Sequence, residues 1–185
     1  MQFVLNEVTF LLERKKSKFI SYLFPYHHID AIKIRLKKEH PKARHFVYAY
    51  RYLNEYDQVV ENSSDDGEPR STSGKPSLAV LNGVDAINTG VITIRYFGGI
   101  KLGTGGLVKA YSDAVNGACE LAEFYKYEKL ERKKITVKHK DMPLLLHTLQ
   151  NHNIRIINKA FDQEVHLTLE ATLEKFNAFD KKYGH

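Results

Sequence analysis

Two short stretches of the sequence gather residues that could do chemistry. The first, DDGEPRSTSGKPSLAVL (Asp65–Leu81), combines three acids, four hydroxyl side chains and two glycines. The second, RYFGGIKLGTGGLVKAYSDAV (Arg95–Val115), combines five glycines with basic side chains. Clustered carboxylates suit hard cations, whereas a glycine-rich loop that leads into a helix aims free N–H groups at an anion. The chemistry to be tested is therefore ion binding, of one sign or the other.

The glycine loop (residues 98–106) follows an apolar, β-branched run and precedes a helical pattern. A helix N-terminus offers unpaired N–H groups and the positive end of the dipole. Arg95, Lys101 and Lys109 are near enough in sequence to add positive charge. The pattern predicts a site for phosphate or a nucleic-acid backbone. It is not a Walker loop, because Thr104 follows Gly103 where that motif requires lysine. The alternative is a tight turn that lets strand and helix pack closely.

The acids Asp65, Asp66 and Glu68 have two interpretations. They could hold a hard cation, but their spacing matches no calcium-binding loop. We favour a role in bracing the loop, by capping a helix or by pairing with Arg95 or Lys101. We accordingly expect no metal and no cofactor.

Hydroxyl and aromatic side chains add further candidates. Ser71, Thr72 and Ser73 could donate to phosphate oxygens, or cap the helix that begins near Lys75. His45, Tyr48 and Tyr50 could stack on bases, or belong to a half-buried strand. The predicted anion- or nucleic-acid-binding residues are Arg70, Ser71, Thr72, Ser73, Lys75, Arg95, Tyr96, Gly98, Gly99, Lys101, Gly103, Thr104, Gly105, Gly106 and Lys109.

The composition limits the class of protein. Hydrophobic residues make up 43% and charged residues 27%, as in ordinary globular domains. Cys119 is the only cysteine, which excludes a disulfide framework and a thiolate metal cluster. The N-terminus does not have the order of a signal peptide, so we expect a cytoplasmic protein with no membrane contact. The net charge of +6 permits an acidic partner such as RNA without requiring one.

The elements that must position these residues follow from periodicity and breakers. Two N-terminal strands joined by a turn at Glu13–Lys16 come first, then a helix from His28 to His40. An alternating strand, RHFVYAYRYL, is followed by a loop from Asn54 to Gly74. The remaining elements predicted for this part are a helix in KPSLAVLNGV, a buried central strand in GVITIRYF and a long helix from Leu107 to Tyr127.

A second, smaller pattern begins after residue 128. Strands are predicted at Ile135–Lys138, Arg155–Ala160 and Val165–Ala171. Helices are predicted at Pro143–His152 and Leu173–Tyr183. This β-α-β-β-α order is that of a ferredoxin-like α/β sandwich, one strand short of the complete motif. The predicted domains are therefore residues 1–128 and 129–185.

Taken together, DDGEP, SGKP and RYFGGIKLGTGGLVKAYSDAV resemble the IMPACT/YigZ family, and SKFISYLFP and HPKARHFVYAYR match its opening. The resemblance covers residues 1–125. It implies an α+β protein: an IMPACT N-terminal-like domain with the fold of the second domain of ribosomal small-subunit protein five. A ferredoxin-like domain similar to the C-terminal domains of elongation factor G would follow. One departure is that Ser71 stands where the family usually has glycine.

The resemblance also implies a link to the regulation of translation. The leading hypothesis is a non-enzymatic RNA- or ribosome-associated factor that binds phosphates in a groove between the DDGEP loop and the glycine loop. A second hypothesis is an enzyme acting on a phosphorylated or nucleotide substrate. A third is a protein-interaction module that displaces a translation-related protein.

Overall fold

The computed structural model describes residues 1–183, which form two compact units: Met1–Tyr127, and a second unit that begins at Glu128. The last two residues of the predicted 129–185 domain lie outside the described residues. Both units combine helices with antiparallel sheets, which confirms the α+β class. In the described part of the chain, no helix is both long and apolar enough to span a bilayer.

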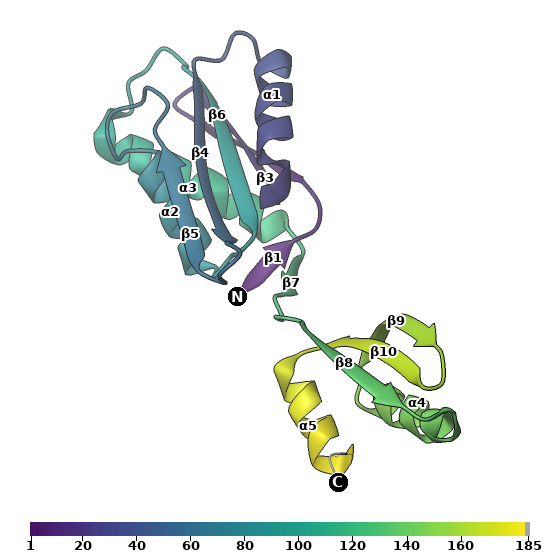
Figure 1. Cartoon of the computed structure of the whole chain (residues 1–185). Coiled ribbons are helices and arrows are strands. Elements are labelled where there is room, and N and C mark those ends of the chain that lie inside the picture. The colour runs from purple at the N-terminus through teal and green to yellow at the C-terminus, as the bar shows by residue number, and fades with distance from the viewer. Residues whose placement is uncertain (184–185) are drawn as a thin grey trace. The chain divides into compact units, whose positions relative to one another are not determined.

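The first unit is built on an antiparallel five-stranded sheet with the strand order β2-β3-β6-β4-β5 (Figure 1). Its strands are β2 (Val8–Arg14), β3 (Ser17–Pro25), β4 (His45–Leu53), β5 (Val59–Ser64) and β6 (Thr89–Tyr96). All residues of β6 except Tyr96 are buried, which confirms the central strand predicted from its apolar run. The short strands β1 (Gln2–Val4) and β7 (Phe124–Lys126) pair separately.

Helices cover the two faces of this sheet unequally. The helix α3 (Gly103–Leu121) packs on β2, β3 and β6, and α2 (Gly74–Gly83) packs on β4, β5 and α3. The opposite face carries α1 (Ile29–Glu39), as Figure 1 shows. Strand alternation explains the two faces: Val47 of β4 joins the α3 cluster, and its neighbour Phe46 joins the α1 cluster.

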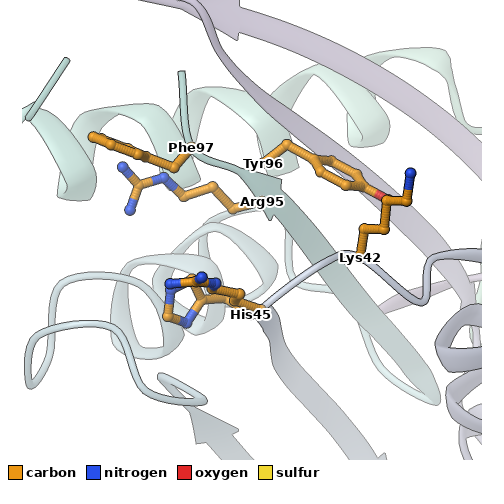
Figure 2. A pocket seen from close by; sticks show the side chains of 6 residues that line it. Lys42, His45, Arg95, Tyr96 and Phe97 are labelled. Atoms are coloured by element: carbon orange, nitrogen blue, oxygen red, sulfur yellow. The ribbon is translucent and has the colours of Figure 1, made fainter. Parts of the chain in front are cut away.

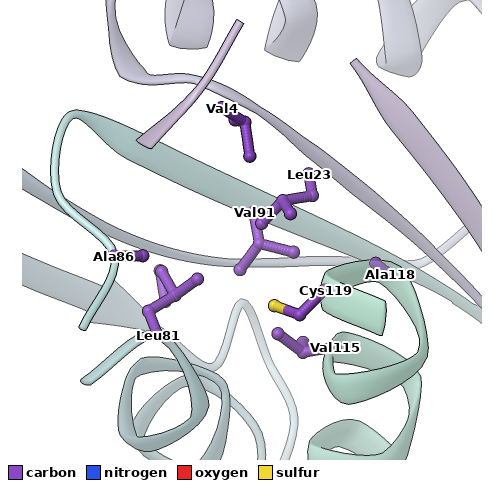
Figure 3. Close-up of a cluster of buried hydrophobic side chains, with 9 residues drawn as sticks. Val4, Leu23, Leu81, Ala86, Val91, Val115, Ala118 and Cys119 are labelled. Carbon is purple, nitrogen blue, oxygen red and sulfur yellow. The ribbon is translucent and has the colours of Figure 1, made fainter. Parts of the chain in front are cut away.

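The core beneath α2 and α3 is formed by small and branched apolar side chains, including Leu23, Val91 and Val115 (Figure 3). Cys119 lies in this cluster and is only 7% exposed. Burial, with a smaller contribution from Glu120, raises the pKa of the Cys119 thiol to about 11. The cysteine is therefore a small residue of the core.

Three predictions for the first unit were wrong in detail. Part of the predicted Asn54–Gly74 loop is β5, whose polar sequence pairs with the edge of β4. The long helix α3 begins at Gly103 instead of Leu107, so the second half of the glycine loop is its first turn. It also ends at Leu121, because the following residues leave the helix to form β7 against β1.

The second unit contains a three-stranded antiparallel sheet in the order β8-β10-β9. Its elements are β8 (Glu131–Val137), α4 (Met142–Asn151), β9 (Arg155–Phe161), β10 (Val165–Ala171) and α5 (Leu173–Tyr183). β10 and α5 coincide with their predicted ranges. Leucines of α4 and β10 pack with Phe176 of α5 into a separate core, so this unit has its own apolar interior.

Candidate functional site

A groove lies in the first unit where the end of β6 meets the start of β4 and of α3. It has a volume of about 390 Å³. It is lined by Arg44, His45, Glu68, Pro69, Arg95, Phe97, Lys101, Leu102, Gly103, Thr104 and Leu107. A neighbouring hollow of about 340 Å³ shares Arg44, His45, Arg95 and Phe97 and adds Lys42 and Tyr96 (Figure 2). The acidic loop (residues 65–74) and the glycine loop therefore border one continuous cationic surface.

Two glycines shape the glycine loop for different reasons. A Cβ on Gly98 would lie 2.0 Å from the backbone carbon of Lys16, so only glycine lets the loop cross the turn between β2 and β3. The Gly98 N–H donates to the Ser17 hydroxyl at 3.1 Å and fixes this crossing. Gly103 has a φ of +74°, a conformation that side chains disfavour. These two positions define how the chain enters α3.

The N-terminus of α3 is open toward the groove. No side chain of residues 1–183 caps it, and its first turn contains no acid. Thr104 and Gly105 are exposed there. A Cβ on Gly105 would meet no atom of the protein within 4 Å, so no packing contact in the fold requires glycine at this position. Gly103 and Thr104 of this first turn line the groove and present their N–H groups to it, whereas Gly105 and Gly106 follow outside the lining.

Arg44 and Lys101 give the groove its available positive charge. Both line it, and both are exposed. Within residues 1–183, neither forms an ion pair with an acid. Lys42, at the adjoining hollow, is exposed as well. These side chains can reach a ligand without first breaking a bond within the protein.

Arg95, in contrast, forms a buried ion pair with Glu68. Its Nη1 donates to both carboxylate oxygens of Glu68, at 2.7 and 2.9 Å, and Tyr111 donates its hydroxyl to the same carboxylate at 2.8 Å. All three residues are buried. Burial, followed by the Glu68 charge, raises the pKa of Tyr111, so its hydroxyl stays protonated. The Arg95 charge is therefore balanced inside the protein.

One nitrogen of Arg95 lacks a hydrogen-bond partner within residues 1–183, and the neighbouring ring of Phe97 is exposed. Arg95 is 8% exposed, and its Nε has no hydrogen-bond partner within the described residues. The Phe97 ring lies 5.6 Å from the Arg95 guanidinium and is 60% exposed, on the same side of β6 as Arg95 (Figure 2). An exposed phenylalanine over a guanidinium is a flat surface on which a ligand ring can stack.

Asp65 holds the acidic loop against the start of α2. Its carboxylate accepts hydrogen bonds from the backbone N–H groups of Ser71, Ser73 and Gly74 and from the Ser73 hydroxyl, at 2.7 to 3.0 Å. Burial acts to raise the pKa of Asp65, but the Ser73 hydroxyl and the three N–H donors lower it overall. Asp65 is thus an ionised cap for α2.

Asp66 ties the same loop to β4. Its Oδ2 accepts from the Phe46 N–H at 2.7 Å, and its carbonyl lies 2.9 Å from His45 Nδ1. The loop also carries strain, because Ser71 has a φ of +61°. Left-handed backbone at a residue with a side chain costs about 1–2 kcal/mol. That is the position at which the sequence departs from the family's glycine.

Several predicted residues lie away from the groove. Thr72 and Ser73 are buried, with their hydroxyls bonded to the Pro69 carbonyl and to Asp65. The side chains of Arg70, Lys75 and Lys109 are exposed but do not line the groove. Tyr48 and Tyr50 lie on the opposite face of β4 from His45. Within residues 1–183, no group of three or more His, Cys, Asp or Glu side chains is arranged to hold a metal ion.

Sequence reasoning missed Arg44 and Phe97. Alternation along β6 could have placed Phe97 beside Arg95, since residues two apart share a face. Arg44 could not be placed this way, because it reaches the groove through the pairing of His45 with Arg95 across β4 and β6. That register is a tertiary feature.

The fold and the groove define the class: a two-unit α+β protein whose first unit contains a groove lined by cationic side chains and by the start of α3. The chain belongs to the IMPACT family, because the Impact N-terminal domain matches residues 15–119. This is the family that the sequence motifs resemble.

Relatives extend the similarity across both units. An IMPACT family member of Haemophilus influenzae is 36% identical over 181 residues, covering 94% of this chain and 87% of the relative. The IMPACT family member YigZ of Escherichia coli is 45% identical over 114 residues, covering 60% of this chain and 56% of the relative. The crystal structure of a hypothetical protein aligns with a TM-score of 0.69 and 33% identity, covering 98% of this chain and 89% of that one.

Proposed function

We propose that the protein is a non-enzymatic RNA-binding factor that holds a phosphate backbone in the groove between the acidic loop and the glycine loop. It would act in the cytoplasm, on RNA or the ribosome, in the regulation of translation. The link to translation comes from the family resemblance. The chemistry comes from the groove, and the two can be tested separately.

The observation that carries the proposal is the pairing of free cations with an open helix end. Arg44 and Lys101 have no acidic partner within residues 1–183, and the N-terminus of α3 beside them has no cap. A phosphate between them would receive charge-assisted bonds from both side chains and from backbone N–H groups. An RNA strand supplies such phosphates in series.

Arg95 and Phe97, which also line the groove, have different roles. Arg95, whose charge Glu68 balances, fixes the position of Phe97 and of the loop. Phe97 offers its exposed ring to a base next to the bound phosphate. The groove then reads a phosphate and a neighbouring ring, a combination found in single-stranded RNA.

The enzyme alternative relies on the acidic loop for metal or charge chemistry. Its carboxylates are occupied by protein donors: Asp65 by the start of α2, Asp66 by Phe46, and Glu68 by Arg95 and Tyr111. No observation on the described residues favours that alternative over RNA binding. We therefore keep one function as the conclusion.

The test is fluorescence anisotropy of the full chain with labelled, mixed-sequence single-stranded RNA over a range of salt concentrations. Affinity should fall steeply with salt, with a slope of about 0.7 per phosphate contacted. Lys101→Ala and Arg44→Ala should each weaken binding and lower that slope by about one contact. The effect should be uniform across RNA sequences.

The matched control is Lys109→Ala, which removes an exposed lysine of α3 that does not line the groove. It should change neither affinity nor slope beyond the small effect of net charge. Absent or salt-independent RNA binding by the unmodified protein would refute the proposal. Equal losses for Lys101→Ala and Lys109→Ala would refute the groove as its location.

A further inference from the structure

A cluster of tyrosines lies on the face of the sheet that α1 only partly covers. Tyr48, Tyr50 and Tyr52 follow one another on this face of β4 because alternate residues of a strand share a side. Tyr26, in the short helical turn after β3, packs against them. All four rings are partly exposed. The groove described above uses none of these side chains.

The rings form ordered stacks. Tyr26 and Tyr52 lie parallel, with an interplanar angle of 3° and centroids 4.1 Å apart. Tyr48 and Tyr50 are also nearly parallel, at 6° and 6.0 Å. Tyr26 is tilted against Tyr50, with centroids 4.9 Å apart. Burial, together with the neighbouring Tyr52, raises the pKa of Tyr26 to about 12, so its ring system stays neutral.

A cavity of about 200 Å³ opens between these rings and α1. It is lined by Tyr26, Ile29, Asp30, Lys33, Tyr48, Tyr50 and Ile92. Aromatic rings form its walls, and Ile92 is the buried residue of the central strand at its base. The cavity is small, largely ring-walled and open at a polar rim.

The rim supplies one acceptor, one donor and positive charge. The Asp30 carboxylate can accept from an amino group. Lys33 Nζ lies 5.0 Å from the centre of the Tyr48 ring and can donate to a carbonyl or ring nitrogen. Lys37, one helical turn further along α1, is exposed and adds a second cation beside Lys33.

We propose that this cavity holds an unpaired base of single-stranded RNA, stacked against the tyrosines. A base is flat, carries amino and carbonyl groups on its edge that Asp30 and Lys33 can bond, and is flanked by phosphates that Lys37 complements. A peptide side chain would match the ring walls but not the cations at the rim. The inference rests on the proposed RNA binding and adds to it a base-reading site on the other face of the sheet.

The experiment combines a substitution in the protein with removal of the bases from the RNA. The affinity of the full chain is measured for a short single-stranded RNA and for the matching strand in which all bases are replaced by abasic residues. Tyr50→Leu removes the ring and keeps an apolar side chain. It should weaken binding of the base-containing strand by about five- to 150-fold, the range for losing one stacked base, and leave the abasic strand unaffected.

Two further variants keep the test decisive. Tyr50→Phe retains the ring and should bind both strands as the unmodified protein does. If Tyr50→Leu proves unstable, Lys33→Met takes its place and should weaken binding of the base-containing strand. Lys101→Ala, in the groove, should weaken both strands equally, because it removes a phosphate contact.

The outcomes separate the two proposals. If the unmodified protein binds RNA but Tyr50→Leu and Lys33→Met bind the base-containing strand equally well, the base site is wrong and RNA binding stands. A loss on both strands alike would also overturn the base site. If the unmodified protein binds neither strand, both proposals fail, and the tyrosines are left to a protein partner.

Discussion

The two loops that border the groove differ in where their polar groups point. In the acidic loop, Asp65, Asp66 and Glu68 each accept hydrogen bonds from the protein itself. In the glycine loop, the first turn of α3 has no capping side chain, and Lys101 has no ion pair within residues 1–183. One loop uses its polar groups to hold the fold together, and the other presents them to the groove.

The difference shows how adjacent polar loops can share a site without sharing a role. Buried polar groups must find partners, and a loop that satisfies its own groups becomes a brace. A loop that leaves donors at a surface remains available for a ligand. Changes in the acidic loop should therefore act first on stability, and changes at Lys101 and in the first turn of α3 first on binding.

The largest expected effect comes from Glu68→Ala. The change leaves the Arg95 guanidinium buried without a counter-charge and removes the acceptor of the Tyr111 hydroxyl. Breaking a buried pair on one side costs about 3–5 kcal/mol. Because Cys119 is buried in the first unit, its reaction with a thiol reagent during urea unfolding measures the stability of that unit.

Glu61→Ala is the matched control for this change. Glu61 also pairs with an arginine, Arg51, but its side chain is 44% exposed. Such a pair contributes about 0–1 kcal/mol. If the two variants lost similar small amounts of stability, Glu68 would not be the brace that distinguishes the acidic loop.

An intermediate effect is expected for Asp65→Ala. The change removes the acceptor of three N–H groups and one hydroxyl at the start of α2, at a cost of about 2 kcal/mol at neutral pH. Because the folded state lowers the pKa of Asp65 below its ordinary value of 3.8, its contribution is complete above that pH. It is lost as the pH falls through the lowered pKa.

The stability difference between the unmodified protein and Asp65→Ala should therefore be constant near neutral pH and shrink in acid. Urea unfolding at a series of pH values measures it. Glu55→Ala, which changes an exposed acid in the turn before β5, should differ little from the unmodified protein at any pH. A gap for Asp65→Ala that did not narrow below about pH 4 would contradict the ionised cap.

Local pattern was sufficient for most of the fold. The apolar run of β6, the alternation of β4 and the helical spacing of α1 each reflect burial of one face or both, which sequence records directly. The edge strand β5 was not predicted, because Glu61–Ser64 is polar and forms a strand only through its pairing with β4. The first turn of α3 was not predicted as helix, because glycines are poor helix formers.

The site was less accessible to sequence reasoning than the fold. The sequence offered Arg95 or Lys101 as a partner for the three acids, but it could not single out Glu68 as the partner of Arg95. The hydroxyls of Thr72 and Ser73 could face either way; in the structure they face inward, where Thr72 donates to the Pro69 carbonyl and Ser73 donates to Asp65. The Glu68–Arg95 pair joins residues 27 positions apart, and the contacts of Thr72 and Ser73 depend on how the loop turns; local periodicity records neither.

The smallest effect on stability, and the sharpest test of the comparison, is Gly105→Ala. Alanine is favoured over glycine in a helix by about 0.5–1 kcal/mol, and a Cβ here would meet nothing in the protein within 4 Å. The variant should therefore be slightly more stable and bind RNA more weakly, because Gly105 directly follows Gly103 and Thr104, which line the groove, and its methyl group would crowd a phosphate bound at this turn. Gly83→Ala, at the end of α2, also adds a Cβ to open space and should gain similar stability with unchanged RNA affinity. If Gly105→Ala bound RNA as tightly as Gly83→Ala, the first turn of α3 would be a structural turn like the acidic loop, and the contrast between the two loops would fail.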